Sequence, residues 1–304
     1  MNAMTPDRRS PPPPYSAVNR ISRVPAREPP SYATATAVPA TTMNNPTSSA
    51  VAPRATRAPS YFVEIPRAVT AYWPKRNLSS EFCLGESPDK LLFRVSKGPH
   101  FAPHPLLALY IGPAKNGLAL GKLHKPDVRN PHDDGLIEIF SPASAKRTVV
   151  HMTSEVHIAH TYRPFTMVVG EGGREHAETF EWRRSRGSEV HTIDKDKVAR
   201  GYKLVRLSGE APTGGHGGKR KERPIGESSD GKEVVAVWVT NDNKRDPERP
   251  DRKPFQFQLC GSGLTGTLGK HFAFVALMTA LKIWITEGPL NAIPVLPDYD
   301  WSRT

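Results

Sequence analysis

The feature that most constrains this chain is a long apolar segment near its C-terminal end. His271–Thr286 (HFAFVALMTALKIWIT) runs for 16 residues without proline or glycine, and 12 of the 14 positions from Phe272 to Ile285 are apolar. A helix that is apolar on every side is either buried on every side or lies in a membrane. As a helix the segment would be roughly 24 Å long, which is shorter than the helix of ~20 apolar residues that a bilayer crossing needs. It also contains a charged residue, Lys282. We therefore predict a buried helix over residues 271–286 and no transmembrane span.

Small residues recur on this predicted helix at Ala273, Ala276 and Ala280. They would allow a surrounding wall of backbone to approach closely. We expect the ammonium group of Lys282 to reach towards one open end of that wall, and Gly288-Pro289 to end the helix.

Short runs of alternating apolar and polar residues, separated by turn signals, fill the chain before the helix. In one run Phe255, Phe257 and Leu259 share a face and the two glutamines between them share the other. About twelve strands are predicted: Tyr61–Ile65, Glu81–Leu84, Leu91–Lys97, Leu106–Ile111, Leu118–His124, Leu136–Phe140, Arg147–Thr153, Phe165–Val169, Thr179–Arg184, Tyr202–Leu207, Val234–Thr240 and Phe255–Cys260. Parallel pairs would need helical crossovers, so the fold class is mainly β, as an antiparallel barrel or sandwich.

The first 60 residues have a different composition. They contain 12 of the 31 prolines, and Pro, Ser, Thr and Ala together occupy 37 of the 60 positions. Such a segment has too few large apolar groups to offset its conformational entropy by burial. We predict a disordered tail over residues 1–60 and a folded domain over residues 61–304.

Two Pro-Pro-x-Tyr motifs lie in the predicted tail, and WW domains bind this pattern in aromatic grooves. The residues that would make the contacts are Pro12, Pro13 and Tyr15 in the first copy and Pro29, Pro30 and Tyr32 in the second. Consecutive prolines pre-form the polyproline II helix, and two copies could engage tandem grooves. The partners implied are WW-domain proteins such as ubiquitin ligases. The alternative is chance occurrence in a proline-rich segment.

The net charge of +12 indicates an acidic partner. It comes from 42 Lys and Arg against 30 Asp and Glu, and residues 61–304 keep 35 against 28. A positive surplus favours phospholipid head groups or nucleic acid. Few aromatic residues lie between the basic ones, which disfavours nucleic-acid binding by stacking.

Basic clusters are the candidates for contact with an anionic surface. Two of them lie in predicted loops over residues 209–232 and 241–253, where solvated loops are the alternative interpretation because acidic residues are interspersed. Residues 219–223 also match a nuclear localisation run. The candidate residues are Arg183, Arg184, Lys219, Arg220, Lys221, Lys244, Arg245, Arg252 and Lys253.

Other motifs give no prediction of a catalytic, metal or cofactor site. Residues 261–266 (GSGLTG) match G-x-G-x-x-G, but no strand–helix alternation exists to build a dinucleotide-binding sheet, so we interpret them as a turn leading into the helix. His157 and His160 would point to opposite faces of a strand, without ligands at metal-binding spacing. An enzyme whose site is assembled from distant residues is the alternative.

The two cysteines indicate where the chain acts. Cys83 and Cys260 lie in apolar strand-like runs, and no basic start followed by an apolar stretch opens the sequence. We expect a cytoplasmic protein, with the membrane surface and the nucleus as the alternative locations.

About twelve strands followed by an all-apolar helix resemble the tubby C-terminal-like family, which includes tubby, LURP-one-related and scramblase-type proteins. The residues that carry the resemblance are the runs 180–183 (FEWR) and 202–207 (YKLVRL) and the helix 268–285 with its glycine-rich approach. The chain is more similar in pattern to the divergent fungal-type members than to tubby itself. The resemblance implies a closed antiparallel barrel threaded by the helix, and no phosphoinositide-binding residue of tubby aligns with this chain.

A barrel filled by a helix would leave its outer wall and loops for binding. We therefore expect a non-enzymatic interaction or adaptor protein. Its barrel would meet an anionic phospholipid surface, and its tail would recruit WW-domain proteins. The alternatives are the enzyme described above and a nucleic-acid-binding protein.

Overall fold

The computed structural model of the 304-residue chain describes eleven ranges. They are residues 63–73, 81–98, 105–125, 133–140, 147–157, 160–195, 200–211, 214–215, 217–219, 223–240 and 255–287. The predicted tail over residues 1–60 and the predicted loop over residues 241–253 lie outside these ranges.

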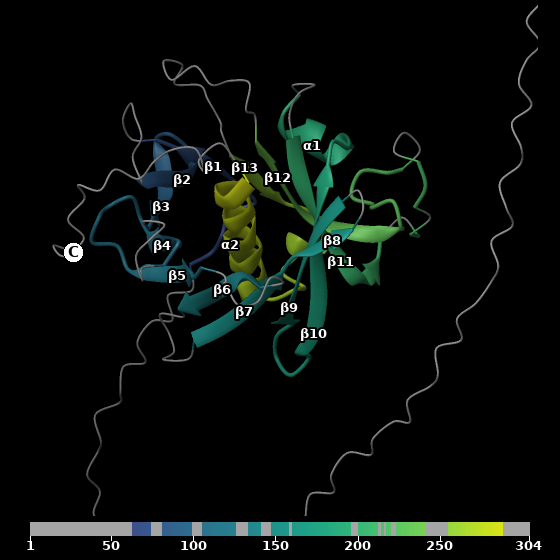
Figure 1. Cartoon of the computed structure of the whole chain (residues 1–304), viewed down its shortest axis with the longest axis horizontal. Coiled ribbons are helices and arrows are strands. Elements are labelled where there is room, and N and C mark those ends of the chain that lie inside the picture. Colours follow the sequence, from purple (N-terminus) through teal and green to yellow (C-terminus); the bar gives the residue numbers. More distant parts are fainter. Residues whose placement is uncertain are drawn as a thin grey trace, which may run out of the picture. The chain divides into compact units, whose positions relative to one another are not determined.

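Among the described residues, twelve strands form a closed antiparallel ring around one helix (Figure 1). The first half of the ring consists of β1 (Ala68–Tyr72), β2 (Glu81–Ser87), β3 (Lys90–Lys97), β4 (Leu107–Ile111), β5 (Ala119–Leu123), β6 (Asp133–Phe140) and β7 (Arg147–Thr153). The second half consists of β9 (His160–Val169), β10 (His176–Ser185), β11 (Arg200–Glu210), β12 (Lys232–Thr240) and β13 (Gln256–Leu259). The β1–β13 pair and the β7–β9 pair join the halves. The predicted mainly β fold and closed barrel are confirmed.

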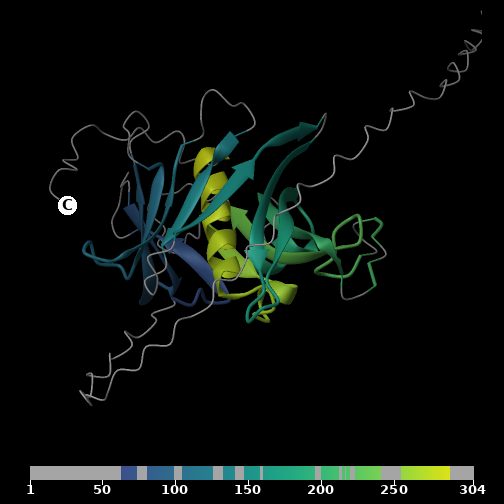
Figure 2. The same cartoon turned by 90° about the horizontal axis from the view of Figure 1, so that it is seen from below.

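The helix α2 (Lys270–Glu287) fills the lumen of this barrel. Figure 2 shows it between the strands of the two halves. Its side chains from Phe274 to Ile285 are buried, and all of them except Thr279 and Lys282 belong to one apolar cluster with the inward-facing strand residues. In the middle of the lumen the indole N–H of Trp182 donates a 2.9 Å hydrogen bond to Oγ1 of Thr279. The predicted buried helix over residues 271–286 is confirmed.

Small residues permit this close fit, as the alanine stripe predicts. Ala276 and Ala280 are fully buried, and the Phe274 ring lies against Gly121 of β5. A Cβ atom at Gly121 would come within 2.9 Å of that ring. The expectation for Lys282 is wrong, because its side chain is 0% exposed: the barrel wall encloses the helix at this position and the ammonium does not reach an open end.

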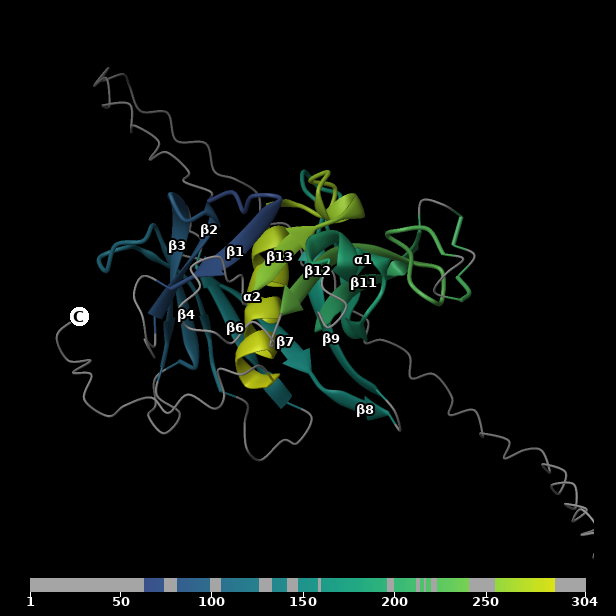
Figure 3. The same cartoon turned by 90° about the horizontal axis from the view of Figure 1, so that it is seen from above.

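A second, smaller cluster lies on the outside of the barrel. The short helix α1 (Ser188–Ile193) follows β10 and packs Val190 onto Val234, Val237 and Val239 of β12 (Figure 3). The turn η1 (Gly261–Gly263) joins β13 to the approach of α2. The outer wall thus carries packed structure that the alternation of apolar residues did not predict.

The strand predictions fail in three places. No strand occupies residues 63–65, although Val63 and Ile65 still pack on the core. Pro66 lacks an N–H and so cannot donate a strand hydrogen bond, and the ring begins after it, at β1. β1 and the short β8 (Glu155–His157), which extends the β9 hairpin, were not predicted as strands. β8 is too short to display an alternating pattern, and in β1 three consecutive residues are buried instead of alternate ones.

Candidate functional site

The structure describes three of the residues predicted to contact an anionic surface: Arg183, Arg184 and Lys219, of which Arg184 and Lys219 are exposed and Arg183 is half-buried. The others lie outside the described residues, as do all six residues of the Pro-Pro-x-Tyr motifs. These are Arg220, Lys221, Lys244, Arg245, Arg252 and Lys253, together with Pro12, Pro13, Tyr15, Pro29, Pro30 and Tyr32.

Arg183 lies on the outer face of β10, where acidic groups neutralise it. Its guanidinium pairs with the carboxylate of Glu181 and, at 2.6 Å, with that of Asp230. Burial alone would raise the pKa of Asp230, but the hydrogen bonds from Arg183 and Ser228 outweigh it and lower this pKa to about 2. Arg183 therefore serves the fold and is a poor candidate for contact with an external anion.

Three exposed arginines gather at one end of the barrel, and we call them the basic rim: Arg184, Arg186 and Arg200. Arg184 is near the end of β10, and Arg200 begins β11, next to Gly201, which pairs with Ser185. Arg186 follows β10 directly. Within the described residues, Arg186 and Arg200 form no ion pair, and the guanidinium of Arg184 lies 6.0 Å from the centre of the Tyr202 ring.

A polar contact behind the rim secures the C-terminal end of α2. The carboxylate of Glu287 accepts hydrogen bonds from the phenol of Tyr202 and the guanidinium of Arg163. Burial, and then the hydrogen bond to Glu287, raise the pKa of Tyr202 well above its ordinary value. Glu287 is thus already engaged within the fold, by Arg163 and Tyr202.

Thr240, the last described residue before the predicted loop over residues 241–253, lies at this same end. It ends β12 and pairs with Arg200. The predicted loop over residues 209–232 lies between β11 and β12 in the sequence. It meets β12 at the other end of that strand, where Glu210 pairs with Lys232. The ends of this nine-residue strand are roughly 27 Å apart at about 3.4 Å per residue. The two basic loops therefore start from opposite ends of the barrel.

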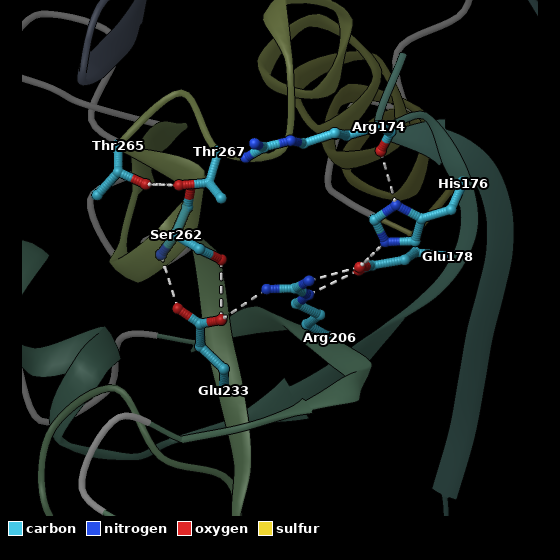
Figure 4. A network of polar contacts seen from close by, with 8 residues as sticks. All are labelled: Arg174, His176, Glu178, Arg206, Glu233, Ser262, Thr265 and Thr267. Carbon is cyan, nitrogen blue, oxygen red and sulfur yellow. Dashed lines mark hydrogen bonds and ion pairs between the residues drawn. The ribbon is translucent and has the colours of Figure 1, made fainter. Parts of the chain in front are cut away.

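The opposite end of the barrel is closed by a chain of charged groups (Figure 4). His176 contacts Glu178 at 2.7 Å, and Arg206 donates to both oxygens of that buried carboxylate. Arg206 also lies 3.6 Å from Glu233, which accepts hydrogen bonds from the backbone N–H and the hydroxyl of Ser262. Burial would raise the pKa of Glu178, but Arg206 and His176 together lower it.

The charged groups in Figure 4 include residue types that are used in catalysis, but their hydrogen bonds do not match those of an activated nucleophile. The hydroxyl of Ser262 donates to Glu233 at 2.8 Å, and Arg206 lies between Glu233 and the pair formed by Glu178 and His176. A nucleophilic serine would need its hydroxyl to donate to a free base. The arrangement instead ties the approach to α2 onto β10, β11 and β12.

The glycine-rich run over residues 261–266 forms η1 and the turn before α2, as predicted. Gly261 has a φ of +46°, and a Cβ there would come within 2.4 Å of Oε1 of Glu233. Position 261 therefore requires glycine, because of its φ and because the Glu233 carboxylate occupies the space of a side chain. No group of three metal-ligating side chains occurs within the described ranges, and no helix in them is long and apolar enough to cross a membrane.

Comparisons with known proteins add no relative: no protein-family model, curated protein or solved structure matches the chain. The likeness to the tubby C-terminal-like family therefore stays a prediction, based on the architecture and the short runs given above.

Sequence reasoning missed part of the rim. Arg200 was not singled out, because no basic residue is directly adjacent to it in the sequence and only strand pairing brings it near Arg184 and Arg186. The alternation of β10 was a usable signal: Phe180 and Trp182 face inward, so Glu181 and Arg183 share the outer face.

Proposed function

We propose that the chain is a non-enzymatic interaction protein whose barrel binds anionic phospholipid surfaces through the basic rim and the basic loop that follows Thr240. The observation that carries this proposal is the exposure of Arg184, Arg186 and Arg200 at one end of a barrel whose lumen is occupied. Exposed arginines near an acidic leaflet contribute about 1 kcal/mol each.

The filled lumen supports an external mode of binding. Barrels that hold a ligand inside need interior space, and here α2 and the inward-facing side chains take that space. The resemblance to the tubby-like family points the same way, since it implies a barrel threaded by a helix.

The test is co-sedimentation of the full chain with vesicles of phosphatidylcholine alone or with 30–40% phosphatidylserine, the composition range being about that of strongly acidic membranes. We expect binding only to the acidic vesicles, and a loss of binding between about 50 and 200 mM salt, because salt screens exposed charges. The triple variant Arg184→Glu, Arg186→Glu, Arg200→Glu is expected to weaken binding at least tenfold.

A variant with the same change in charge elsewhere controls for net charge. Lys90, Arg147 and Arg174 are exposed and lie outside the rim, and their replacement by glutamate should weaken binding much less. Equal losses in the two triple variants would refute the rim as the site. Binding that ignores salt would refute an electrostatic surface contact, and preference for duplex DNA over acidic vesicles would favour the nucleic-acid alternative.

We further propose that the Pro-Pro-x-Tyr motifs recruit WW-domain proteins such as ubiquitin ligases. A purified tandem WW protein should capture the full chain, and the double variant Tyr15→Ala, Tyr32→Ala should lose this capture because each tyrosine is the aromatic anchor of its motif. Capture of the double variant at the level of the unchanged chain would show that the motifs are unused.

A further inference from the structure

A pocket of about 410 Å³ lies on the outer wall of the barrel, outside the filled lumen, and its lining contains none of the three rim arginines. Its floor is formed by β12 and β13, one side by α1, and the other sides by η1 and the loop before β12. Five of its thirteen lining residues have aliphatic side chains: Ile193, Ile225, Val234, Leu259 and Leu264. The volume is in the range of sites for small ligands.

Two of these apolar side chains are exposed at the opening of the pocket. Ile225 is 64% exposed and Leu264 is 39% exposed. Ile225 belongs to the loop before β12, which is held on the wall by a 2.9 Å hydrogen bond from the N–H of Val234 to the carbonyl of Gly226. Gly226 has a φ of +93°, a conformation that favours glycine, so the loop geometry that presents Ile225 depends on this residue. The opening offers an apolar surface to a ligand.

Glu233 and Glu189 are the acidic residues that line the pocket, and each has a basic residue of the protein near it. Glu233 accepts two hydrogen bonds from Ser262 and lies 3.6 Å from Arg206. Glu189 is close to Lys203: burial lowers the pKa of this lysine, and the Glu189 carboxylate opposes that shift. Cys260 also lines the pocket, and burial raises the pKa of its thiol to about 11, so it is neutral there.

Arg67 is the remaining charged residue of the lining. It is exposed, and it forms no ion pair within the described part of the chain. A 2.8 Å hydrogen bond from the N–H of Leu259 to the carbonyl of Arg67 fixes its backbone beside the floor of the pocket. The backbone of Arg67 is thus held in place, and its side chain supplies a guanidinium group to the lining of the pocket. Guanidinium groups pair well with carboxylates and phosphates.

We propose that this pocket binds a single-chain anionic amphiphile, such as a fatty-acid carboxylate, with its apolar chain against Ile193, Ile225 and Leu264 and its acidic head on Arg67. The site goes beyond the proposed rim function, since it needs no membrane. A cationic head group is the competing ligand, because Oε2 of Glu189 is buried without a hydrogen-bond partner in the described residues.

Two probes with the same alkyl chain and head groups of opposite charge distinguish an anionic from a cationic ligand. Dodecanoate and dodecyltrimethylammonium, each below its critical micelle concentration, are titrated into the full chain by calorimetry. We expect one dodecanoate per chain and at least tenfold weaker binding of the cationic probe. Arg67→Glu should weaken dodecanoate binding at least tenfold, and Ile225→Asp should also weaken it.

Matched controls identify the site. Arg147→Glu makes the same change in charge on β7, and Leu118→Asp places the same acid at another exposed apolar position. Both should bind dodecanoate as the unchanged chain does, and thermal unfolding checks that every variant is folded. The triple rim variant should also bind normally, which separates this site from vesicle binding.

The proposal is overturned if dodecanoate does not bind, if the cationic probe binds as well or better, or if Arg67→Glu has no more effect than Arg147→Glu.

Discussion

Arg183 and Arg184 are neighbours in the sequence but occupy different environments. Arg183 faces outward on β10 and is held between Glu181 and Asp230, whereas Arg184 lies over Tyr202 at the open end of the barrel. The alternation of a strand produces this difference, because successive side chains point to opposite faces. A basic pair in a strand should therefore be divided into its two faces before either residue is assigned to a binding surface.

The pair between Arg183 and Asp230 predicts a pH dependence of stability. Because the pKa of Asp230 is lowered to about 2 in the folded chain, its contribution is present above its ordinary pKa of 3.8 and is lost as the pH falls towards 2. Asp230→Asn should cost about 0.5–1 kcal/mol at pH 7, since the carboxylate is partly exposed. Urea unfolding at several pH values measures this.

The variant and the unchanged chain should converge in stability as the pH falls from about 4 towards 2. Asp89→Asn, in the turn between β2 and β3, is the control and should change stability little at any pH. A loss from Asp230→Asn that persists undiminished at pH 2 would show that the carboxylate acts through something other than its charge.

At the scale of elements, α2 determines the size of the barrel lumen. Ala280 is fully buried inside the barrel, whereas Ala273 near the start of the helix is only partly buried. Ala280→Leu should cost about 1–3 kcal/mol of unfolding free energy, because a larger side chain must displace the enclosing wall. Ala273→Leu should cost less. If Ala280→Leu left the urea midpoint unchanged, the lumen would have spare room beside the helix.

The elements that the sequence predicted best are those whose signal is repeated along many residues. The helix α2 was found because its apolar run is unbroken, and Trp238 and Phe257 lie in strands with clear patterns. β8 escaped prediction because three residues give almost no period, and β1 because three consecutive residues of it are buried, so it lacks the alternation of a half-buried strand. α1 escaped because it is six residues long and packs on the outside, where tertiary contacts decide its conformation.

The whole molecule shows why the candidate sites were harder to predict than the fold. The pairing of β11 with β10 and β12 brings Arg200 beside Thr240 and beside the end of β10, and the direction of β12 places the starts of the two basic loops at its opposite ends. Likewise, the pocket combines Arg67 with residues near positions 190, 225 and 260. These associations follow from strand order and register, which local patterns do not contain.

The central claim is that a barrel filled by its own helix binds at its surface. Hydrogen–deuterium exchange of the full chain, with and without acidic vesicles, tests it most directly. We predict slow exchange in α2 under both conditions, and new protection with vesicles at peptides that cover Arg184, Arg186 and Arg200. Fast exchange in α2 that becomes slow only with vesicles would contradict the account, because the helix would then be a membrane-inserting segment and not the core of the barrel.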